Sequence, residues 1–209
     1  MLELLAADPR SLSSVRDPHQ AWTAHVADSL TGLEVPAVRS ARAIADVGAG
    51  AGFPGLVLAV ALPQARVDLI ESVTRKCDFM RDAAAQAGIE NARVVNARSE
   101  EHAAGAGREA YDVVTARAVA RLATLAELAS PLLREGGTLV AWKGRRDADE
   151  EEELARASEL LAMAPRKILE VGESAGYEHR HLHVARKTGR TPPNLPRRPG
   201  VAKKRPLGS

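Results

Sequence analysis

A glycine-rich stretch, DVGAGAGFPG at Asp46–Gly55, constrains the possible fold of this chain more than any other feature. Glycine loses more backbone entropy on folding than any other residue, so four glycines in ten residues need a structural reason. The apolar run before them, Ala41–Gly48, is predicted as a buried strand, and the run after them, Leu56–Leu62, as a helix. We therefore predict a tight strand-to-helix turn at which a ligand approaches the backbone.

The rest of the chain continues this alternation of apolar runs with helical patterns. We expect strands at 65–72, 92–97, 111–116 and 137–144, helices at 74–88, 122–133 and 147–162, and two more strands at 166–171 and 179–185. Strands that alternate with helices form an open parallel sheet, and the last two candidates are predicted to pair as an antiparallel hairpin. The expected architecture is an α/β, Rossmann-like domain at 41–187, a short helical segment at 1–40 and a flexible tail at 188–209.

Composition excludes several classes of protein. The 209 residues include one cysteine, so neither a disulfide scaffold nor a Cys-rich zinc site is expected. No apolar run approaches the roughly 20 residues of a membrane span, and the N-terminus lacks a signal-peptide pattern, so we expect a cytoplasmic protein. His179, His181 and His183 alternate along one strand and have a spacing that suits a metal. With no fourth ligand evident, we favour a half-exposed strand face and expect no metal.

Charge is distributed unevenly along the chain. The net charge is +2, yet Arg186–Ser209 alone carries eight basic residues and no acid, which leaves −6 on the remainder. A basic, proline-rich tail on an acidic body is typical of an interaction segment, and phosphate is the obvious polyanion for it. Few of its residues are apolar, so we expect it to be extended or flexible in the absence of nucleic acid.

The glycine-rich stretch matches two cofactor-binding patterns. Gly50–Gly55 matches the dinucleotide pattern G-x-G-x-x-G, with Glu71 placed 21 residues after Gly50 as a ribose ligand. Asp46–Gly52 matches instead the acid-x-G-x-G-x-G pattern of S-adenosylmethionine methyltransferases. We favour the second, because Pro54 lacks the N–H that a pyrophosphate needs and the Asp46 carboxylate would repel it. The same carboxylate suits the cationic sulfonium of S-adenosylmethionine. A glycine turn without a ligand is the remaining alternative.

Several further motifs point to one family. The segments DVGAGAGFPG, LIES with RKCDFM, NARSEE, TARAVA, and AWKG before an acidic helix occur in this order. Together with HVADSL near the start and LPRRPGVAKKRPL near the end, the chain resembles the bacterial 16S ribosomal RNA guanine-N7 methyltransferases, the RsmG or GidB family. The resemblance covers most of the chain. It departs from the family in the short sequence before HVADSL, which leaves the contribution of that region open.

The resemblance implies a class I S-adenosylmethionine-dependent methyltransferase that acts on guanine N7, at position 527 of the 16S RNA. Guanine N7 has a lone pair and no proton at neutral pH, so the reaction needs positioning rather than a general base. The cofactor ligands implied by position and resemblance are Asp46, Gly48, Gly50, Phe53, Glu71, Ser99, Glu100 and Arg117. Within this set, Gly48, Gly50 and Phe53 would line the methionine, Glu71 would bind the ribose, and Ser99 with Glu100 would contact the adenine. The latter pair could equally be a helix N-cap and its first-turn acid.

Two basic residues at strand ends are our catalytic candidates. Arg117 ends the fourth predicted strand, where amine methyltransferases often carry an Asn/Asp-Pro-Pro-aromatic motif, and a guanidinium there could hold guanine O6 or a phosphate. The alternative for Arg117 is an ion pair with an acid such as Asp112. Lys143 ends the fifth strand and is the second candidate for a contact with RNA, with a surface lysine as its alternative.

The expected partner is 16S ribosomal RNA or a small-subunit particle, bound by a monomer. We assign RNA contacts to the tail residues Arg197, Arg198, Lys203, Lys204 and Arg205. Deleting the tail should weaken RNA binding and leave cofactor affinity almost unaltered. Three alternatives remain: a small-molecule methyltransferase, a nicotinamide oxidoreductase, and an RNA-binding module with a degenerate cofactor pocket.

Overall fold

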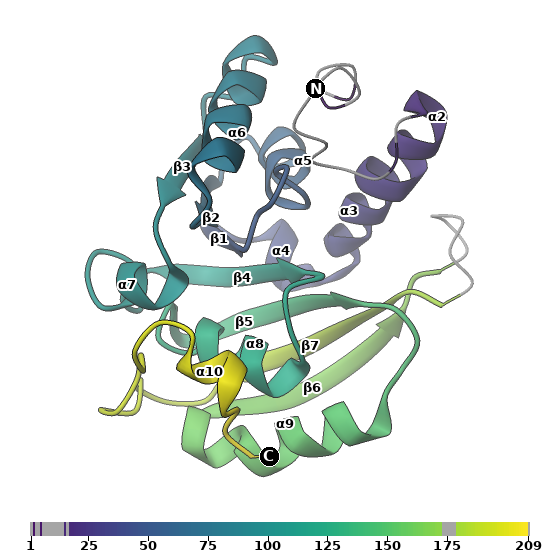
Figure 1. Cartoon of the computed structure of the whole chain (residues 1–209). Coiled ribbons are helices and arrows are strands. Elements are labelled where there is room, and N and C mark those ends of the chain that lie inside the picture. The colour runs from purple at the N-terminus through teal and green to yellow at the C-terminus, as the bar shows by residue number, and fades with distance from the viewer. Residues whose placement is uncertain (1, 3–4, 6–14, 16, 173–178, 209) are drawn as a thin grey trace.

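A mixed sheet of seven strands forms the centre of the molecule within the residues that the computed structural model describes, which are 2, 5, 15, 17–172 and 179–208. The strand order is β3-β2-β1-β4-β5-β7-β6 (Figure 1). Strands β1 to β5 are parallel, whereas β7 runs antiparallel to both β5 and β6. The expected mostly parallel sheet with a C-terminal antiparallel hairpin is confirmed.

The strands lie close to their predicted positions. They are β1 (Ala43–Val47), β2 (Arg66–Glu71), β3 (Ala92–Asn96), β4 (Tyr111–Arg117), β5 (Leu133–Lys143), β6 (Met163–Glu170) and β7 (His181–Lys187). The helices after them are α5 (Gly55–Ala61), α6 (Thr74–Gln86), α7 (Ser99–Ala103), α8 (Leu122–Ala129), α9 (Ala148–Leu161) and α10 (Val201–Lys204). Helical turns before the sheet are α2 (Pro18–Ala21), η1 (Trp22–Ala27), α3 (Asp28–Leu30), η2 (Thr31–Glu34) and α4 (Pro36–Arg39).

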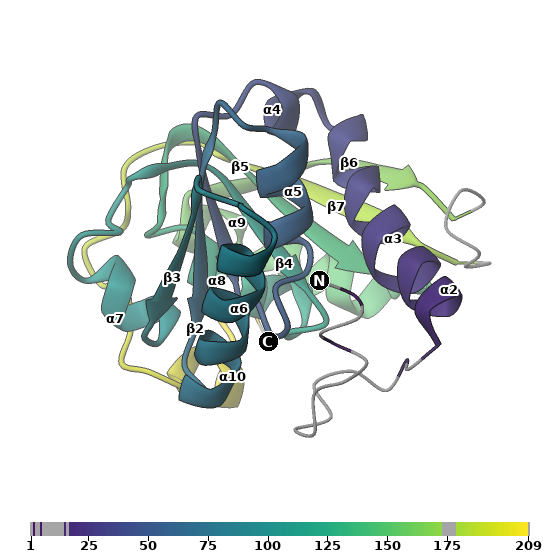
Figure 2. The ribbon, with the colours of Figure 1, turned by 90° about the horizontal axis from the view of Figure 1, so that it is seen from above.

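Helices cover both faces of the sheet, and each face has its own apolar core (Figure 2). On one face, α5 and α6 pack on residues such as Ile44 and Leu69, which point to that side of β1 and β2. On the other face, α8 and α9 cover residues such as Ala45 and Val114. Successive strand residues therefore bury alternate side chains on opposite faces, as an open sheet with two covered faces requires.

The region after α8 differs from the prediction. We expected a helix at 122–133, but α8 ends at Ala129 and β5 already begins at Leu133. Pro131 follows two residues after the end of the helix, and proline cannot donate the backbone hydrogen bond that a further turn would need. The extra strand residues pair with the start of β4, where Tyr111 lies opposite Leu133.

The N-terminal segment, residues 17–40, is helical over much of its length and lies on the α5 face of the sheet (Figure 2). Its main anchor is Trp142 of β5, whose ring is fully buried and whose Nε1 donates to the Asp28 carbonyl at 2.9 Å. The same indole nitrogen lies 3.1 Å from the Thr31 hydroxyl. These bonds hold the segment across the carboxyl ends of the central strands.

The tail, residues 188–208, differs from the flexible segment that we expected. It runs back along the body, and Leu195 and Ala202 are almost fully buried against the α8 face of the sheet. Its start is held by Lys187, a buried lysine whose ammonium group donates to the Leu133 carbonyl at 2.9 Å and to Thr191 at 2.7 Å. Although the tail is mostly polar, these few contacts give it a defined path over the surface.

The histidine strand also departs from expectation. His181 and His183 are buried rather than half-exposed, because β7 lies inside the sheet between β5 and β6. Within the described residues, no group of three His, Cys, Asp or Glu side chains is placed to hold a metal ion. No helix in that part of the chain is both long and apolar enough to cross a membrane.

Candidate functional site

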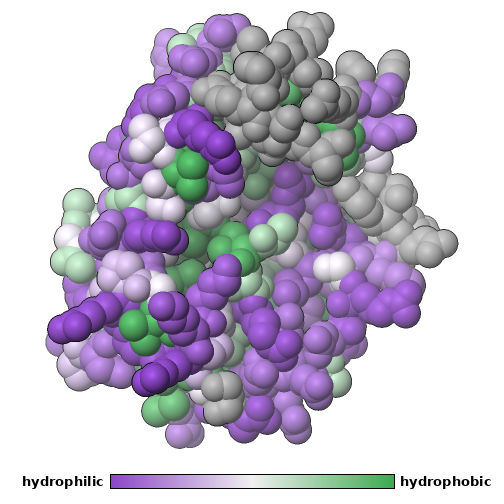
Figure 3. Space-filling model, viewed as in Figure 1, coloured by the Kyte–Doolittle hydropathy of each residue, from purple (hydrophilic) through white to green (hydrophobic). Residues whose placement is uncertain are grey.

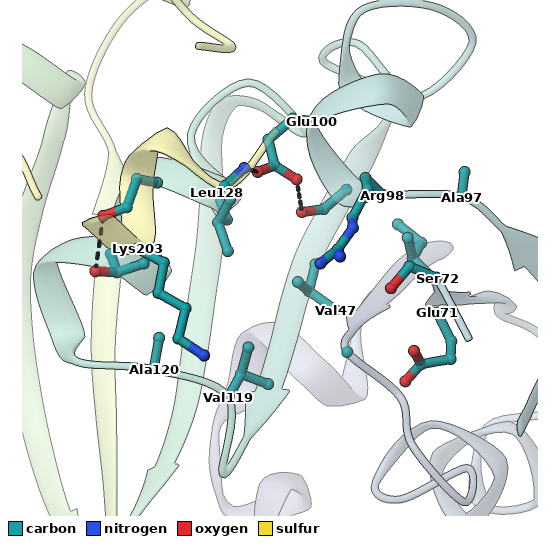
Figure 4. Close-up of a pocket in the computed structure, with 16 residues that line it drawn as sticks. Val47, Glu71, Ser72, Ala97, Arg98, Glu100, Val119, Ala120, Leu128 and Lys203 are labelled. Atoms are coloured by element: carbon teal, nitrogen blue, oxygen red, sulfur yellow. Dashed lines mark hydrogen bonds between the residues drawn. The ribbon is translucent and has the colours of Figure 1, made fainter. Parts of the chain in front are cut away.

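A pocket opens at the carboxyl ends of β1, β2 and β3, where parallel sheets bind their ligands (Figure 4). We refer to it as the central pocket. Apolar residues gather near the middle of this face of the molecule, within a rim of polar ones (Figure 3). The lining residues come from the strand ends, α7, α8 and the tail: Val47, Gly48, Ile70, Glu71, Ser72, Ala97, Arg98, Ser99, Glu100, Val119, Ala120, Thr124, Leu128, Gly200, Ala202 and Lys203.

Glu71 is the principal acid of the central pocket. It ends β2, is only 7% exposed, and directs its carboxylate into the space between β2 and the glycine turn (Figure 4). One oxygen accepts the backbone N–H of Gly50 at 3.1 Å, and the other accepts that of Val73 at 2.9 Å. A carboxylate can accept about four hydrogen bonds, so Glu71 retains capacity for a ligand with two hydroxyl donors. Gly50 thus acts through Glu71 rather than by lining the pocket itself.

The glycine turn is tight because parts of the protein approach it closely. Gly48 has a positive φ of 67°, and a Cβ there would lie 2.8 Å from a methyl group of Val119. A Cβ on Gly55 would lie 2.2 Å from the Leu69 side chain. The close neighbours at these two positions are the protein's own side chains, whereas we expected a ligand. Gly48 nevertheless lines the central pocket, as the sequence predicted.

Asp46 is not placed as we expected. Its carboxylate is fully buried beneath the glycine turn, where it accepts the Gly55 N–H at 2.9 Å and the Thr115 hydroxyl at 2.9 Å. It does not belong to the lining of the central pocket, so it holds the turn in shape instead of facing a sulfonium. Burial raises the pKa of Asp46 to about 6, although the hydrogen bonds from Thr115 and Gly55 act in the opposite direction.

Ser99 and Glu100 meet the tail at the far wall of the central pocket. Ser99 is the first residue of α7, so the cap position falls on Arg98 and the alternative of a Ser99 N-cap is one residue out. The Ser99 hydroxyl donates to one Glu100 oxygen at 3.1 Å. The other Glu100 oxygen accepts the backbone N–H of Gly200 at 2.8 Å (Figure 4). Both predicted residues line the pocket, together with a residue of the tail.

Phe53 and Arg117 form a second group at the same edge, under the N-terminal segment. The Phe53 ring stacks on the imidazole of His25 with 4.8 Å between ring centroids, and the Arg117 guanidinium lies 5.4 Å from the Phe53 centroid. Burial, followed by the positive charge of Arg117, lowers the pKa of His25 below its ordinary value. The imidazole is therefore neutral at pH 7. Phe53 is only 6% exposed, so the Arg117 guanidinium is the group of this pair that suits a flat, hydrogen-bonding base.

The acid that pairs with Arg117 is Asp28. The alternative that we considered, an ion pair of Arg117 with Asp112, is wrong. The buried Asp28 carboxylate lies 2.8 Å from Arg117 and 2.7 Å from Arg180, whose side chains are 13% and 16% exposed. We call these three residues the arginine cluster. Asp112 lies at the opposite end of β4 and pairs with Arg134 at 2.8 Å. One acid between two guanidinium groups leaves a net positive charge at the edge of the site.

Lys143 is occupied by a partner at the end of β5. Its ammonium group lies 2.7 Å from Glu150 of α9 and donates to the Ala120 carbonyl at 3.3 Å. The side chain is 21% exposed and does not line the central pocket. The structure therefore groups Lys143 with α9, apart from the other predicted site residues.

Sequence reasoning missed several residues of the site. Asp28 and His25 share the helical spacing i, i+3 within HVADSL, a signal that was available before the structure. Glu127, which pairs with Arg197 of the tail beside the central pocket, is the lone acid in the otherwise apolar helix LATLAELA and is thereby marked as unusual. Arg180 and Gly200 carry no comparable signal, because only the folding of the hairpin and the tail brings them to the site.

The chemistry of the central pocket fits S-adenosylmethionine better than a dinucleotide. Its two lining acids, Glu71 and Glu100, accept hydrogen bonds, as the hydroxyls of a ribose and the amino group of an adenine require. A pyrophosphate would need free backbone N–H groups, and the Gly50 N–H that it would use already donates to Glu71. The residues that would hold the adenosine half are therefore Glu71, Ser99 and Glu100.

Comparison with known proteins gives one family. Residues 4–183 match the family model described as GidB, rRNA small subunit methyltransferase G. Ribosomal RNA small subunit methyltransferase G of Staphylococcus aureus strain Newman is 36% identical over 199 residues, which cover 94% of this chain and 82% of that protein. The protein of the same name from Pelotomaculum thermopropionicum is 38% identical over 198 residues, or 94% of this chain and 83% of the relative.

Solved structures agree with this result at the level of the fold. A SAM-dependent methyltransferase from Aquifex aeolicus has a TM-score of 0.64 at 17% identity and covers 87% of this chain and 99% of that one. A predicted O-methyltransferase from Agrobacterium tumefaciens has a TM-score of 0.58 at 25% identity and covers 71% of this chain and 74% of that one. The class I methyltransferase fold and S-adenosylmethionine as cofactor, both expected from the sequence, are confirmed.

Proposed function

We propose that this chain, which belongs to the family of rRNA small subunit methyltransferase G, transfers a methyl group to N7 of a guanine in 16S ribosomal RNA. Membership of the family confirms that the chain is a methyltransferase. The guanine, its N7 atom and the roles of individual residues are parts of the proposal, supported by the arrangement at the carboxyl edge of the sheet.

The observation that carries the proposal is the pairing of two different sites around one glycine turn. On one side, Gly48 and Glu71 line the central pocket. On the other, Phe53 contacts His25 and Arg117, beside the arginine cluster. A bound cofactor and a base held by Arg117 of the second group would then meet across the turn, which is the geometry that a direct methyl transfer needs.

The residues present divide the work between binding and positioning. Glu71 would accept the ribose hydroxyls, and the Ser99–Glu100 wall would contact the adenine. S-adenosylmethionine, when bound, supplies an electrophilic methyl group. Arg117, oriented by Asp28, would donate to guanine O6 and so hold the neighbouring N7 toward the turn. Guanine N7 has no proton to lose, so a neutral His25 has no proton to remove and serves as a stacking partner for Phe53.

The tail and the arginine cluster would supply most of the attraction for phosphate. The exposed side chains of Arg198, Lys203, Lys204 and Arg205 lie on a body that is otherwise net acidic. Arg197, which we expected to contact RNA, instead pairs with Glu127 and so contributes to the fold of the tail. In this proposal the enzyme works as a monomer in the cytoplasm, where it meets the RNA or the small-subunit particle.

Two measurements test the proposal. Calorimetric titration with S-adenosylhomocysteine and with NAD should give binding with the first alone. Incubation of small-subunit particles with the enzyme and labelled S-adenosylmethionine, followed by chemical cleavage at 7-methylguanine, should place the label at one guanine of the 16S RNA. A methyl group found on an exocyclic amine, a ribose or a small metabolite would contradict the proposed reaction, and binding of NAD would contradict the assignment of the pocket.

A further inference from the structure

We infer that the docked tail is a working part of the cofactor site, so that cofactor binding and tail docking stabilise each other. The inference rests on the proposed function only in taking S-adenosylmethionine as the ligand of the central pocket. It departs from our expectation that the tail serves RNA alone and leaves cofactor affinity unaltered.

The first observation is that the tail forms one wall of the central pocket. Gly200, Ala202 and Lys203 line it opposite Glu71, on the side where Glu100 stands (Figure 4). The Gly200 N–H donates to Glu100 at 2.8 Å, and the Ala202 carbonyl lies 3.4 Å from the Thr124 hydroxyl of α8. In the close-up, the Lys203 side chain extends toward Val119 and Ala120, which also line the pocket.

The second observation is that the tail orients a predicted cofactor ligand. Glu100 accepts from Ser99 with one oxygen and from Gly200 with the other, so its carboxylate is held between α7 and the tail. Without Gly200, one oxygen would lose its partner and the side chain could rotate away from the pocket. An adenine amino group placed here would meet a carboxylate already set in position, which reduces the entropy lost on binding.

The third observation is that one ion pair anchors this wall to the body. The Arg197 guanidinium makes two parallel bonds of 2.5 Å to the Glu127 carboxylate of α8, and it also donates to the Arg205 carbonyl at 2.7 Å. Glu127 is only 3% exposed. Arg197 precedes α10 and its bond to Arg205, which follows α10, links the segments on the two sides of this helix. Such a two-pronged bond fixes orientation as well as distance, so its loss should release the wall.

The neighbouring arginine provides a matched control. Arg198 carries the same charge in the next position, but its side chain is exposed. Arg197→Gln and Arg198→Gln therefore change the net charge equally, whereas the first alone breaks the anchor. We expect Arg197→Gln to weaken S-adenosylhomocysteine binding by about tenfold, the scale of one lost hydrogen bond to a charged group. Arg198→Gln should bind this ligand like the unmodified protein, as measured by calorimetry.

The unmodified protein provides a second test that needs no variant. We expect trypsin to cleave after Lys203 and Lys204, which belong to α10, when the tail detaches. Because coupling between two binding equilibria is reciprocal, saturating S-adenosylhomocysteine should reduce the detached fraction of the tail by about tenfold, and cleavage that follows this fraction should slow equally. Cleavage after Arg145 or Arg146, which lie exposed in the loop before α9, serves as the control, and its rate should not change when the ligand is added.

The outcomes separate the inference from the proposed function. Weaker binding by Arg197→Gln alone, together with ligand-dependent protection of the tail, supports the inference. Equal affinities of the two variants, or tail cleavage that ignores a ligand known to bind, would overturn it and leave the proposed function standing. Absence of S-adenosylhomocysteine binding to the unmodified protein would instead refute the cofactor assignment itself.

Discussion

The N-terminal segment and the tail cover the same edge of the sheet from opposite faces and use reversed charges to do so. In the N-terminal segment, the buried acid belongs to the segment, and Asp28 receives Arg117 and Arg180 from the body. In the tail, the buried acid belongs to the body, and Glu127 of α8 receives Arg197 from the tail. The first arrangement organises cations beside the proposed base site, whereas the second holds the tail that forms one wall of the central pocket.

The two segments also differ in how deeply they are anchored. The N-terminal segment is bonded to the fully buried indole of Trp142, and a Cβ on its Gly32 would lie 2.7 Å from that ring. The tail buries only small portions of itself, with Leu195 and Ala202 as its apolar contacts. The difference implies that disturbing the N-terminal segment affects the whole fold, while disturbing the tail acts locally. Four experiments, in order of decreasing expected effect, test the two segments and the acidic residues between them.

The largest effect is expected at Asp28. Asp28→Asn leaves two guanidinium groups without their shared counter-charge in a buried place, and breaking a buried ion pair by removing one partner typically costs about 3–5 kcal/mol. We expect the variant to unfold at a lower denaturant concentration and to methylate RNA at least roughly a hundredfold more slowly. Arg180→Gln is the control, because Asp28 then keeps Arg117. If the control lost as much activity as Asp28→Asn, the proposed positioning of Arg117 would be wrong.

The next effect concerns Glu71, which belongs to neither segment. Glu71→Gln keeps an oxygen that can accept from Gly50 but removes the negative charge that would hold the ribose hydroxyls. A hydrogen bond to a charged group contributes about 1.5–3 kcal/mol, so cofactor affinity should fall by roughly ten- to a hundredfold. Titration with S-adenosylhomocysteine measures the loss. An unchanged dissociation constant would remove Glu71 from the cofactor site.

A third experiment uses Asp46, which is a buried acid like Asp28 and Glu127. Those two acids pair with arginine side chains, whereas Asp46 accepts hydrogen bonds from one backbone N–H and one hydroxyl. Burial raises its pKa from 3.8 to about 6, so the folded protein binds this proton more tightly than the unfolded chain does. The stability that the proton contributes is complete below about pH 3.8 and is lost as the pH rises through 6.

Asp46→Asn should remove this pH dependence. Each unit of pKa shift corresponds to about 1.4 kcal/mol. As the pH rises from 4 to 7, the unmodified protein should therefore lose up to about 3 kcal/mol of unfolding free energy relative to the variant. Urea titrations at several pH values measure the difference. Parallel pH profiles of the two proteins would show that Asp46 titrates normally.

The smallest effect concerns the exposed cations of the tail. Each phosphate contact on single-stranded RNA contributes about −0.7 to the slope of log affinity against log salt concentration. Lys204→Gln and Arg198→Gln should each make the slope shallower by about this amount. Exchange of Lys167, an exposed lysine of β6 far along the sheet order from the pocket, serves as the control. A slope that changes equally in all three variants would mean that the tail has no particular role in RNA binding.

The accuracy of the sequence predictions varied with the range of the interactions involved. Apolar runs and helical patterns located β1 to β4 together with α5 and α6, because strands of a sheet covered on both faces bury nearly continuous apolar runs. Gly48, Glu71, Ser99 and Glu100 line the central pocket for a related reason: the carboxyl ends of neighbouring parallel strands meet at one edge. The end of α8 was predicted too late, because the pattern continued past Pro131 while the backbone did not.

The sequence by itself thus determined the fold class, the family and those residues of the central pocket that follow directly on strands. It left the direction of Asp46, the partner of Arg117 and the path of the tail undetermined, and the tertiary structure decided all three. Ion pairs such as Arg117 with Asp28, separated by 89 residues, and Arg197 with Glu127, separated by 70, depend on chain packing at long range. No local pattern encodes these pairs, because the fold decides which of the many arginines lies next to a given buried carboxylate.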